Sequence, residues 1–168
     1  YIVIEFGIES IYDQTLKRIN RQENFEEVKR TIHQCAERGL NIGTHFIFGL
    51  PGESREQMMN SVSEINKLPI SGIKFHQLQI VAGTTMAKDY KSHPDDYDLF
   101  SFDEYVDFII RFTERLNPKF IIERFAGEVP PRYLAGPGWG LIRNDQINIA
   151  IEKEMDKRNT WQGKFYSQ

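Results

Sequence analysis

Segments with a strand pattern alternate with segments of helical pattern along this chain, and this order constrains the fold more than any other feature. The expected strands are Ile2–Ile8, Asn41–Phe48, Gly72–Ile80 and Phe120–Arg124. The expected helices run from Asn24 to Gly39, Ser54 to Pro69, Ser101 to Pro118 and Asp145 to Arg158. The first three open on a cap residue with Glu or Gln three positions later. This βαβα order predicts an α/β fold of parallel strands, neighbours in chain order, with helices on one outer face.

Length and composition fit one domain, 1–168. A hydrophobic share of 40%, with twelve Phe and seven Tyr, can fill a core. The formal net charge of −3 argues mildly against a dedicated nucleic-acid binder. The longest apolar runs are too short to span a bilayer, and no signal peptide pattern opens the chain. A strand pattern already at Tyr1 leads us to expect further residues upstream. Cys35 has no partner for an internal disulfide, which favours the cytoplasm.

Two stretches are expected to be irregular. Residues 81–100 carry no clear periodicity, and residues 125–143 are rich in Gly and Pro. Loops of this length in a small domain are typical of lids or of family-specific decoration.

Strand parity places ionisable side chains on one face. Alternate residues of a strand point to opposite sides. If the bulky side chains face the helices, the opposite, inner face carries Glu5, Glu9, His45, Lys74 and His76. Five such groups would be costly there unless they pair or bind a ligand. The inner face is therefore the expected site.

Two turns at strand ends could hold a ligand. The turn from Gly49 through Pro51 to Ser54 permits close backbone approach, and free amides at the start of the helix could receive polar ligand atoms. From the residues alone, an ordinary strand-to-helix turn capped by Ser54 is the more common explanation. The Glu9 carboxylate could accept two hydroxyl protons, or form a salt bridge. Arg21 could pair with a carboxylate, or be a solvated surface residue.

The third strand carries two further candidates. Lys74 and His76 lie on one face and could bind an anionic substrate or move protons; the alternative is an ion network with Glu5. We expect His33 and Cys35 to be structural, and no spacing of His and Cys indicates a metal site.

Several motifs together resemble the second half of a radical S-adenosylmethionine (SAM) domain. They are EFGIES at 5–10, INR at 19–21 and FIFGLPGE at 46–53. The similarity points to the Elongator-type branch, and GIKFHQL at 72–78 with TWQG at 160–163 resembles its bacterial YhcC-like subfamily. The resemblance implies the C-terminal portion of a partial TIM-type (β/α)6 barrel. Residues 1–80 would form its C-terminal half, and 81–168 the last strand, helices and a family-specific extension.

The resemblance also implies a chemistry and roles. Such enzymes hold a [4Fe-4S] cluster on a CxxxCxxC loop and cleave SAM to a 5′-deoxyadenosyl radical that abstracts hydrogen. A cluster needs three thiolates, so its ligands are expected upstream of this chain. By motif position Glu9 and His45 would contact the ribose, Arg21 the SAM carboxylate, and Gly49 with Pro51 the adenosine. His45 departs from the aspartate found there in the coproporphyrinogen oxidase branch.

The resemblance therefore predicts part of a cytoplasmic Fe–S oxidoreductase, with Lys74, His76 and Glu5 as catalytic candidates. Its partners would be a small-molecule or tRNA substrate and an electron donor such as flavodoxin or ferredoxin, without a membrane. Two alternatives remain. One is a cluster-independent barrel enzyme that uses Glu5, Glu9 and His76 as acids and bases. The other is a non-catalytic barrel that binds a nucleotide or tRNA.

Overall fold

Four parallel strands form one sheet in chain order. In the computed structural model, which describes residues 2–167, the strands are β1 (Val3–Glu9), β2 (Asn41–Phe48), β3 (Gly72–Gln77) and β4 (Ile121–Arg124). β1 pairs with β2, β2 with β3 and β3 with β4, all parallel. The predicted α/β fold and strand order are confirmed.

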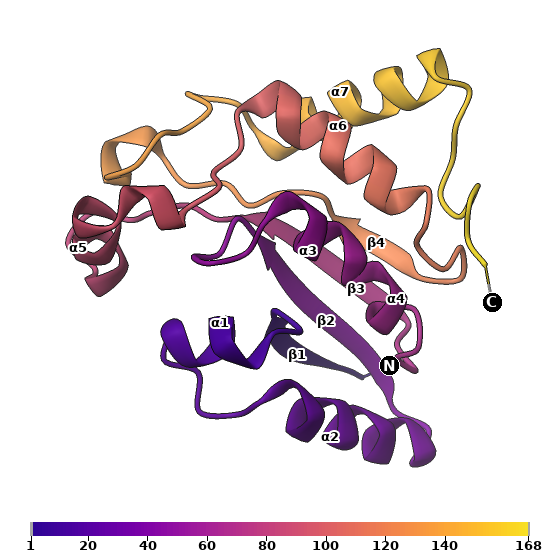
Figure 1. The fold of residues 1–168 in the computed structure, drawn as a ribbon. Coiled ribbons are helices and arrows are strands. Elements are labelled where there is room, and N and C mark those ends of the chain that lie inside the picture. The colour runs from indigo at the N-terminus through magenta and orange to yellow at the C-terminus, as the bar shows by residue number, and fades with distance from the viewer. Residues whose placement is uncertain (1, 168) are drawn as a thin grey trace.

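Helices cover the face of the sheet opposite the polar side chains. Figure 1 shows α5 beyond the carboxyl end of the sheet and α7 packed above α6. The helices are α1 (Asp13–Arg18), α2 (Phe25–Glu37), α3 (Arg55–Asn60), α4 (Val62–Ile65), α5 (Thr85–Ser92), α6 (Phe102–Thr113) and α7 (Asn144–Lys157), with short 3-10 turns at Pro94–Asp96 and Pro131–Tyr133. All three expected cap pairs form reciprocal capping boxes, at Asn24, Ser54 and Ser101.

The core lies between the sheet and the helices and is built on aromatic side chains. Phe48 and Phe75 stack with their ring centroids 5.5 Å apart. Two side chains of α6, Phe108 and Phe112, meet Phe48 edge-on at 4.9 and 5.0 Å. Phe75 is fully buried. This packing fixes which face of the sheet is apolar, and so which face is left for the polar groups.

Three expectations about elements need correction. Residues 81–100 are not irregular throughout, because they contain α5. No residue of α5 is buried, so the helix presents no side chain to the core. The expected helix from Ser54 to Pro69 divides at Ser61 into α3 and α4. The third strand ends at Gln77 instead of Ile80.

Within residues 2–167, no helix combines the length and the apolar character needed to cross a membrane.

Candidate functional site

An ion network lies on the inner face across all four strands. Lys74 donates to Glu5 and lies 3.4 Å from the Glu123 carboxylate. His45 Nε2 lies 2.8 Å from the other oxygen of Glu5. The bond to Glu5 raises the pKa of Lys74, and the bond to Lys74 lowers the pKa of Glu5. Lys74 is therefore a cation at neutral pH, and the ion network that was the alternative interpretation of these residues is present.

Glycines on the inner face make room for these long side chains. A Cβ atom at Gly72 would lie 2.4 Å from Glu123 Oε1, and one at Gly43 would lie 3.3 Å from Glu5 Cγ. At Gly7 it would lie 2.3 Å from Glu9 Oε1. The acidic side chains thus lie flat across the sheet because three successive strands lack a side chain beneath them.

Glu9 lies on this face, at an irregular end of β1. The register with β2 shifts between Gly7 and Glu9, and Glu9 has a φ of 64°, which is uncommon for a non-glycine residue. Within the described residues its carboxylate accepts no hydrogen bond, and the nearest cation, Arg21, lies 4.0 Å away. Burial raises the pKa of Glu9 despite Arg21. A desolvated carboxylate without donors is costly, which is typical of a ligand-binding group.

Arg21 is committed in part to the backbone. Its guanidinium donates to the carbonyl of Gly7 at 2.5 Å and lies 3.8 Å from Glu23. It therefore supports the end of β1 and lies beside Glu9, while its remaining donors stay available.

The turn after β2 has the tight glycine geometry that the sequence predicts. Gly49 and Gly52 have φ values of 92° and 88°. Their amides already have acceptors, because Gly49 N lies 3.0 Å from Met58 Sδ and Gly52 N donates to the Asp96 carbonyl at 2.8 Å. These two amides are therefore not free, and the free amides predicted at the start of α3 stay a prediction. The turn can still offer its close-packed backbone and Pro51 to a ligand.

Sequence reasoning assigned no role to Glu53, which joins the two strand ends. Its buried carboxylate accepts a hydrogen bond from Ser10 at 2.5 Å and another from Thr15. Burial raises the pKa of Glu53. The bonds tie the β1–α1 connection to the turn after β2. The signal in the sequence was an acidic residue between a glycine turn and a helix cap.

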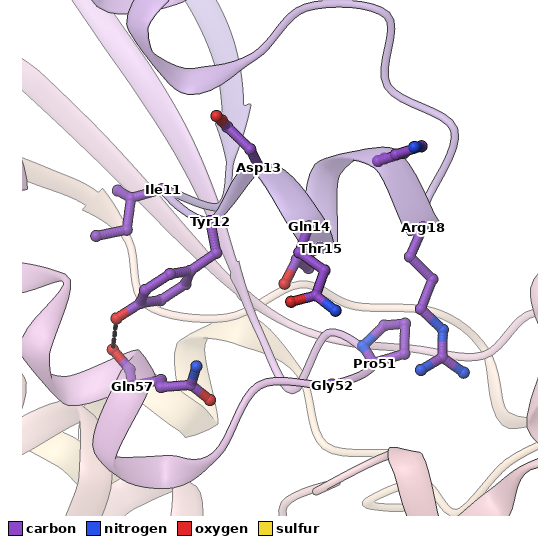
Figure 2. A pocket seen from close by; sticks show the side chains of 10 residues that line it. Ile11, Tyr12, Asp13, Gln14, Thr15, Arg18, Pro51, Gly52 and Gln57 are labelled. Carbon is purple, nitrogen blue, oxygen red and sulfur yellow. Dashed lines mark hydrogen bonds between the residues drawn. The ribbon is translucent and has the colours of Figure 1, made fainter.

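A cavity of about 560 Å³ lies beside these turns, between α1 and the β2–α3 connection (Figure 2). Tyr12 and Gln57 line it, and the Tyr12 hydroxyl donates to the Gln57 carbonyl at 2.8 Å. Of the predicted site residues only Pro51 reaches it. The cavity is therefore distinct from the inner face that carries Glu9.

His76 lies half-buried on the inner face beside His45. Its ring centroid is 6.0 Å from that of His45. Burial first, then the charges of Arg124, His45 and Lys74, lower the pKa of His76 to about 4. The imidazole is therefore neutral at physiological pH, when it can both donate and accept hydrogen bonds.

We expect His76 to make stability fall in acid. Because its pKa is lower in the folded than in the unfolded chain, unfolding takes up a proton between about pH 4 and 6.5. The free energy of unfolding has its full value above that window and decreases as pH falls through it. After discounting for solvent contact, the effect should be roughly 1 kcal/mol. Urea unfolding at several pH values should show a flatter dependence for His76→Gln than for the parent.

The exposed His33 provides the control for that measurement. His33→Gln should keep the parent's pH dependence, because the side chain lies on the outer surface of α2. Equal dependence in His76→Gln and the parent would contradict the assignment.

A metal cluster does not fit the residues present. No group of three His, Cys, Asp or Glu side chains within residues 2–167 could hold a metal ion. The sequence has one cysteine, Cys35, which lies on α2. Three thiolates are needed to hold a [4Fe-4S] cluster. A SAM-like ligand fits better, because the Glu9 carboxylate accepts no hydrogen bond within the described residues and could accept two from hydroxyl groups.

Fold and site together define a parallel α/β half-barrel with candidate ligand groups at the carboxyl ends of its strands. The sequence model of the radical SAM superfamily matches residues 1–65, and that of the radical SAM C-terminal domain matches residues 70–157. The chain therefore belongs to the radical SAM superfamily, in the branch that contains Elongator-type and YhcC-like proteins.

Relatives in three organisms place the chain within longer proteins. It is 31% identical to YtqA of Bacillus subtilis over 99% of this chain and 51% of that protein. It is 32% identical to YhcC of Escherichia coli over 81% of this chain and 43% of that protein. The chain thus spans about half the length of these relatives. The solved structure of Elp3 from Methanocaldococcus infernus superposes with a TM-score of 0.79 at 19% identity, covering 94% of this chain and 36% of that one, which supports the partial TIM-type barrel.

Proposed function

We propose that this chain is the C-terminal part of a radical SAM enzyme and that its inner face binds SAM at the carboxyl ends of β1 and β2. The observation that carries the proposal is the Glu9 carboxylate, which is largely buried, accepts no hydrogen bond within the described residues and lies on the inner face at the irregular end of β1. A vicinal diol supplies the two hydroxyl donors that such a carboxylate requires. Family membership supports the choice of SAM, whose ribose carries that diol.

The other residues take roles around this contact. Arg21 would orient the SAM carboxylate with the guanidinium N–H groups that do not bind the Gly7 carbonyl. The backbone at Gly49 and the ring of Pro51 would lie along the adenosine. His45 is engaged by Glu5, so its contact with the ribose would be through the opposite edge of its ring. Bound SAM would supply a 5′-deoxyadenosyl radical for hydrogen abstraction, with the cluster ligands contributed by residues outside this chain.

The ion network and His76 would face the substrate. The raised pKa of Lys74 favours a fixed positive charge over a proton-transfer role, with Glu5 holding it in place. The neutral His76 imidazole is the better candidate to exchange a proton or a hydrogen bond with substrate. We place the enzyme in the cytoplasm, with an electron donor such as flavodoxin or ferredoxin and a small-molecule or tRNA substrate.

The test is SAM chemistry in the full-length protein. Purified without oxygen and reduced, it should bind SAM and release 5′-deoxyadenosine, measured by equilibrium dialysis and by chromatography. Binding of SAM without its cleavage would support the cofactor site and contradict the assignment of radical chemistry. Failure to bind SAM would overturn the proposal.

A further inference from the structure

The last strand ends on two consecutive charged residues, Glu123 and Arg124, beside the inner-face ion network. The register of β4 against β3 shifts between Ile73 and Lys74, so that Lys74 lies opposite Arg124 and Glu123 becomes the extra residue. An extra residue in a strand bends it and re-aims a side chain. Glu123 reaches Lys74. Arg124 pairs with Lys74 across the two strands, two residues before His76 on β3, and the charge of Arg124 contributes to the lowered pKa of His76.

Arg124 is left without a partner. Within the part of the chain that the structure describes, it forms no ion pair and no hydrogen bond, and it is exposed. The neighbouring carboxylates are committed elsewhere, since Glu123 approaches Lys74 at 3.4 Å and Glu5 binds both Lys74 and His45. An exposed arginine is ordinary in itself. One placed by a register shift beside a half-buried histidine points to a ligand.

The loop after β4 keeps the adjoining edge of His76 in place. The buried Gln77 side chain accepts from the amide of Gly127 at 2.9 Å and donates to its carbonyl at 3.0 Å. A Cβ atom on Gly127 would lie 2.7 Å from His76 Nδ1 and 3.4 Å from Gln79 Oε1. Gly127 is thus held against the imidazole at a distance that only glycine permits. The ring position is built into the fold.

We propose that Arg124 and His76 form a subsite for an oxyanion group of the substrate, either a carboxylate or a phosphate. A guanidinium binds two oxygens of such a group at once, and an imidazole N–H can donate a further hydrogen bond to one of its oxygens. Arg124 is a single unpaired cation, within the described residues, beside a network in which Glu5, His45, Lys74 and Glu123 pair with one another. Nucleic acids require several phosphate contacts. The inference therefore favours a small acid or phosphate ester over RNA. It rests on the proposed function only in taking the ligand to be the enzyme's substrate.

Histidine NMR tests the subsite directly. The protein with isotope-labelled histidine is titrated with inorganic phosphate and, separately, with acetate. Phosphate, acetate or both should shift the His76 signal saturably, and Arg124→Gln should weaken that binding about tenfold, as loss of a charged hydrogen-bond pair does. Arg30→Gln is the matched control, because Arg30 is an exposed arginine of α2 and should leave binding as in the parent.

The anion that binds more tightly identifies the oxyanion group, phosphate or carboxylate, that the subsite takes. Equal shifts at His33 and His93, no shift at His76, or unchanged binding in Arg124→Gln would overturn the subsite. The titration contains no SAM, so a failure of SAM binding in the parent would remove the proposed function while leaving the result on the subsite intact.

Discussion

Replacing Phe75 by alanine should lower the free energy of unfolding by about 3–5 kcal/mol, the range for truncating a buried phenylalanine. Phe75 is fully buried at the centre of the sheet, stacks on Phe48 and meets Phe112 edge-on at 5.4 Å. The alanine variant loses the transfer free energy of the ring and leaves a cavity between β3 and α6. Urea unfolding followed by circular dichroism would measure the loss.

Phe165→Ala is the control for Phe75→Ala. Phe165 is 56% exposed, and its contacts are with the cations of Arg115 and Lys164. Its loss should cost no more than about 1 kcal/mol, the value of an exposed cation–π pair. A Phe75→Ala variant as stable as Phe165→Ala would mean that β3 is not the centre of the core.

The fold was predictable where its signals lie within a few residues of one another in the sequence. β2 has the predicted bounds, Asn41–Phe48, because a buried strand between a glycine turn and a helix cap leaves little freedom. The capping boxes at Asn24, Ser54 and Ser101 formed as predicted, since they depend on residues three positions apart. α5 escaped prediction because tertiary ion pairs, such as Arg18 with Asp89 at 2.9 Å, hold it instead of an apolar face.

The candidate site was predictable only up to the ends of the strands. Alternation placed Glu5, His45 and Lys74 on one face, and they bind one another there. It could not show the register shift that brings Arg124 opposite Lys74, because an extra residue appears only when two strands pair. Nor could it show that the amide of Gly52 is used by Asp96, which lies 44 positions away along the chain.

Glu9→Ala should weaken SAM binding by about 1.5–3 kcal/mol, or about 10- to 150-fold in Kd, as loss of hydrogen bonds to a charged group does. Equilibrium dialysis with the full-length protein would measure it. Glu23→Ala is the matched control, since Glu23 lies near the same arginine, at 3.8 Å, but is 60% exposed. It should bind SAM as the parent does. Equal weakening in both variants would show that net charge, and not a ribose contact, is responsible.

Stability then separates a ligand-binding Glu9 from a structural one. The carboxylate is desolvated, accepts no hydrogen bond within the described residues and has its only nearby cation at 4.0 Å, so its removal should leave the free energy of unfolding of the ligand-free protein unchanged or slightly higher. A structural carboxylate would behave in the opposite way. If Glu9→Ala unfolds at lower urea than the parent, the weaker SAM binding reflects a damaged strand end. If Glu9→Ala unfolds at the same or higher urea concentration, Glu9 does not stabilise the fold and its role is ligand binding.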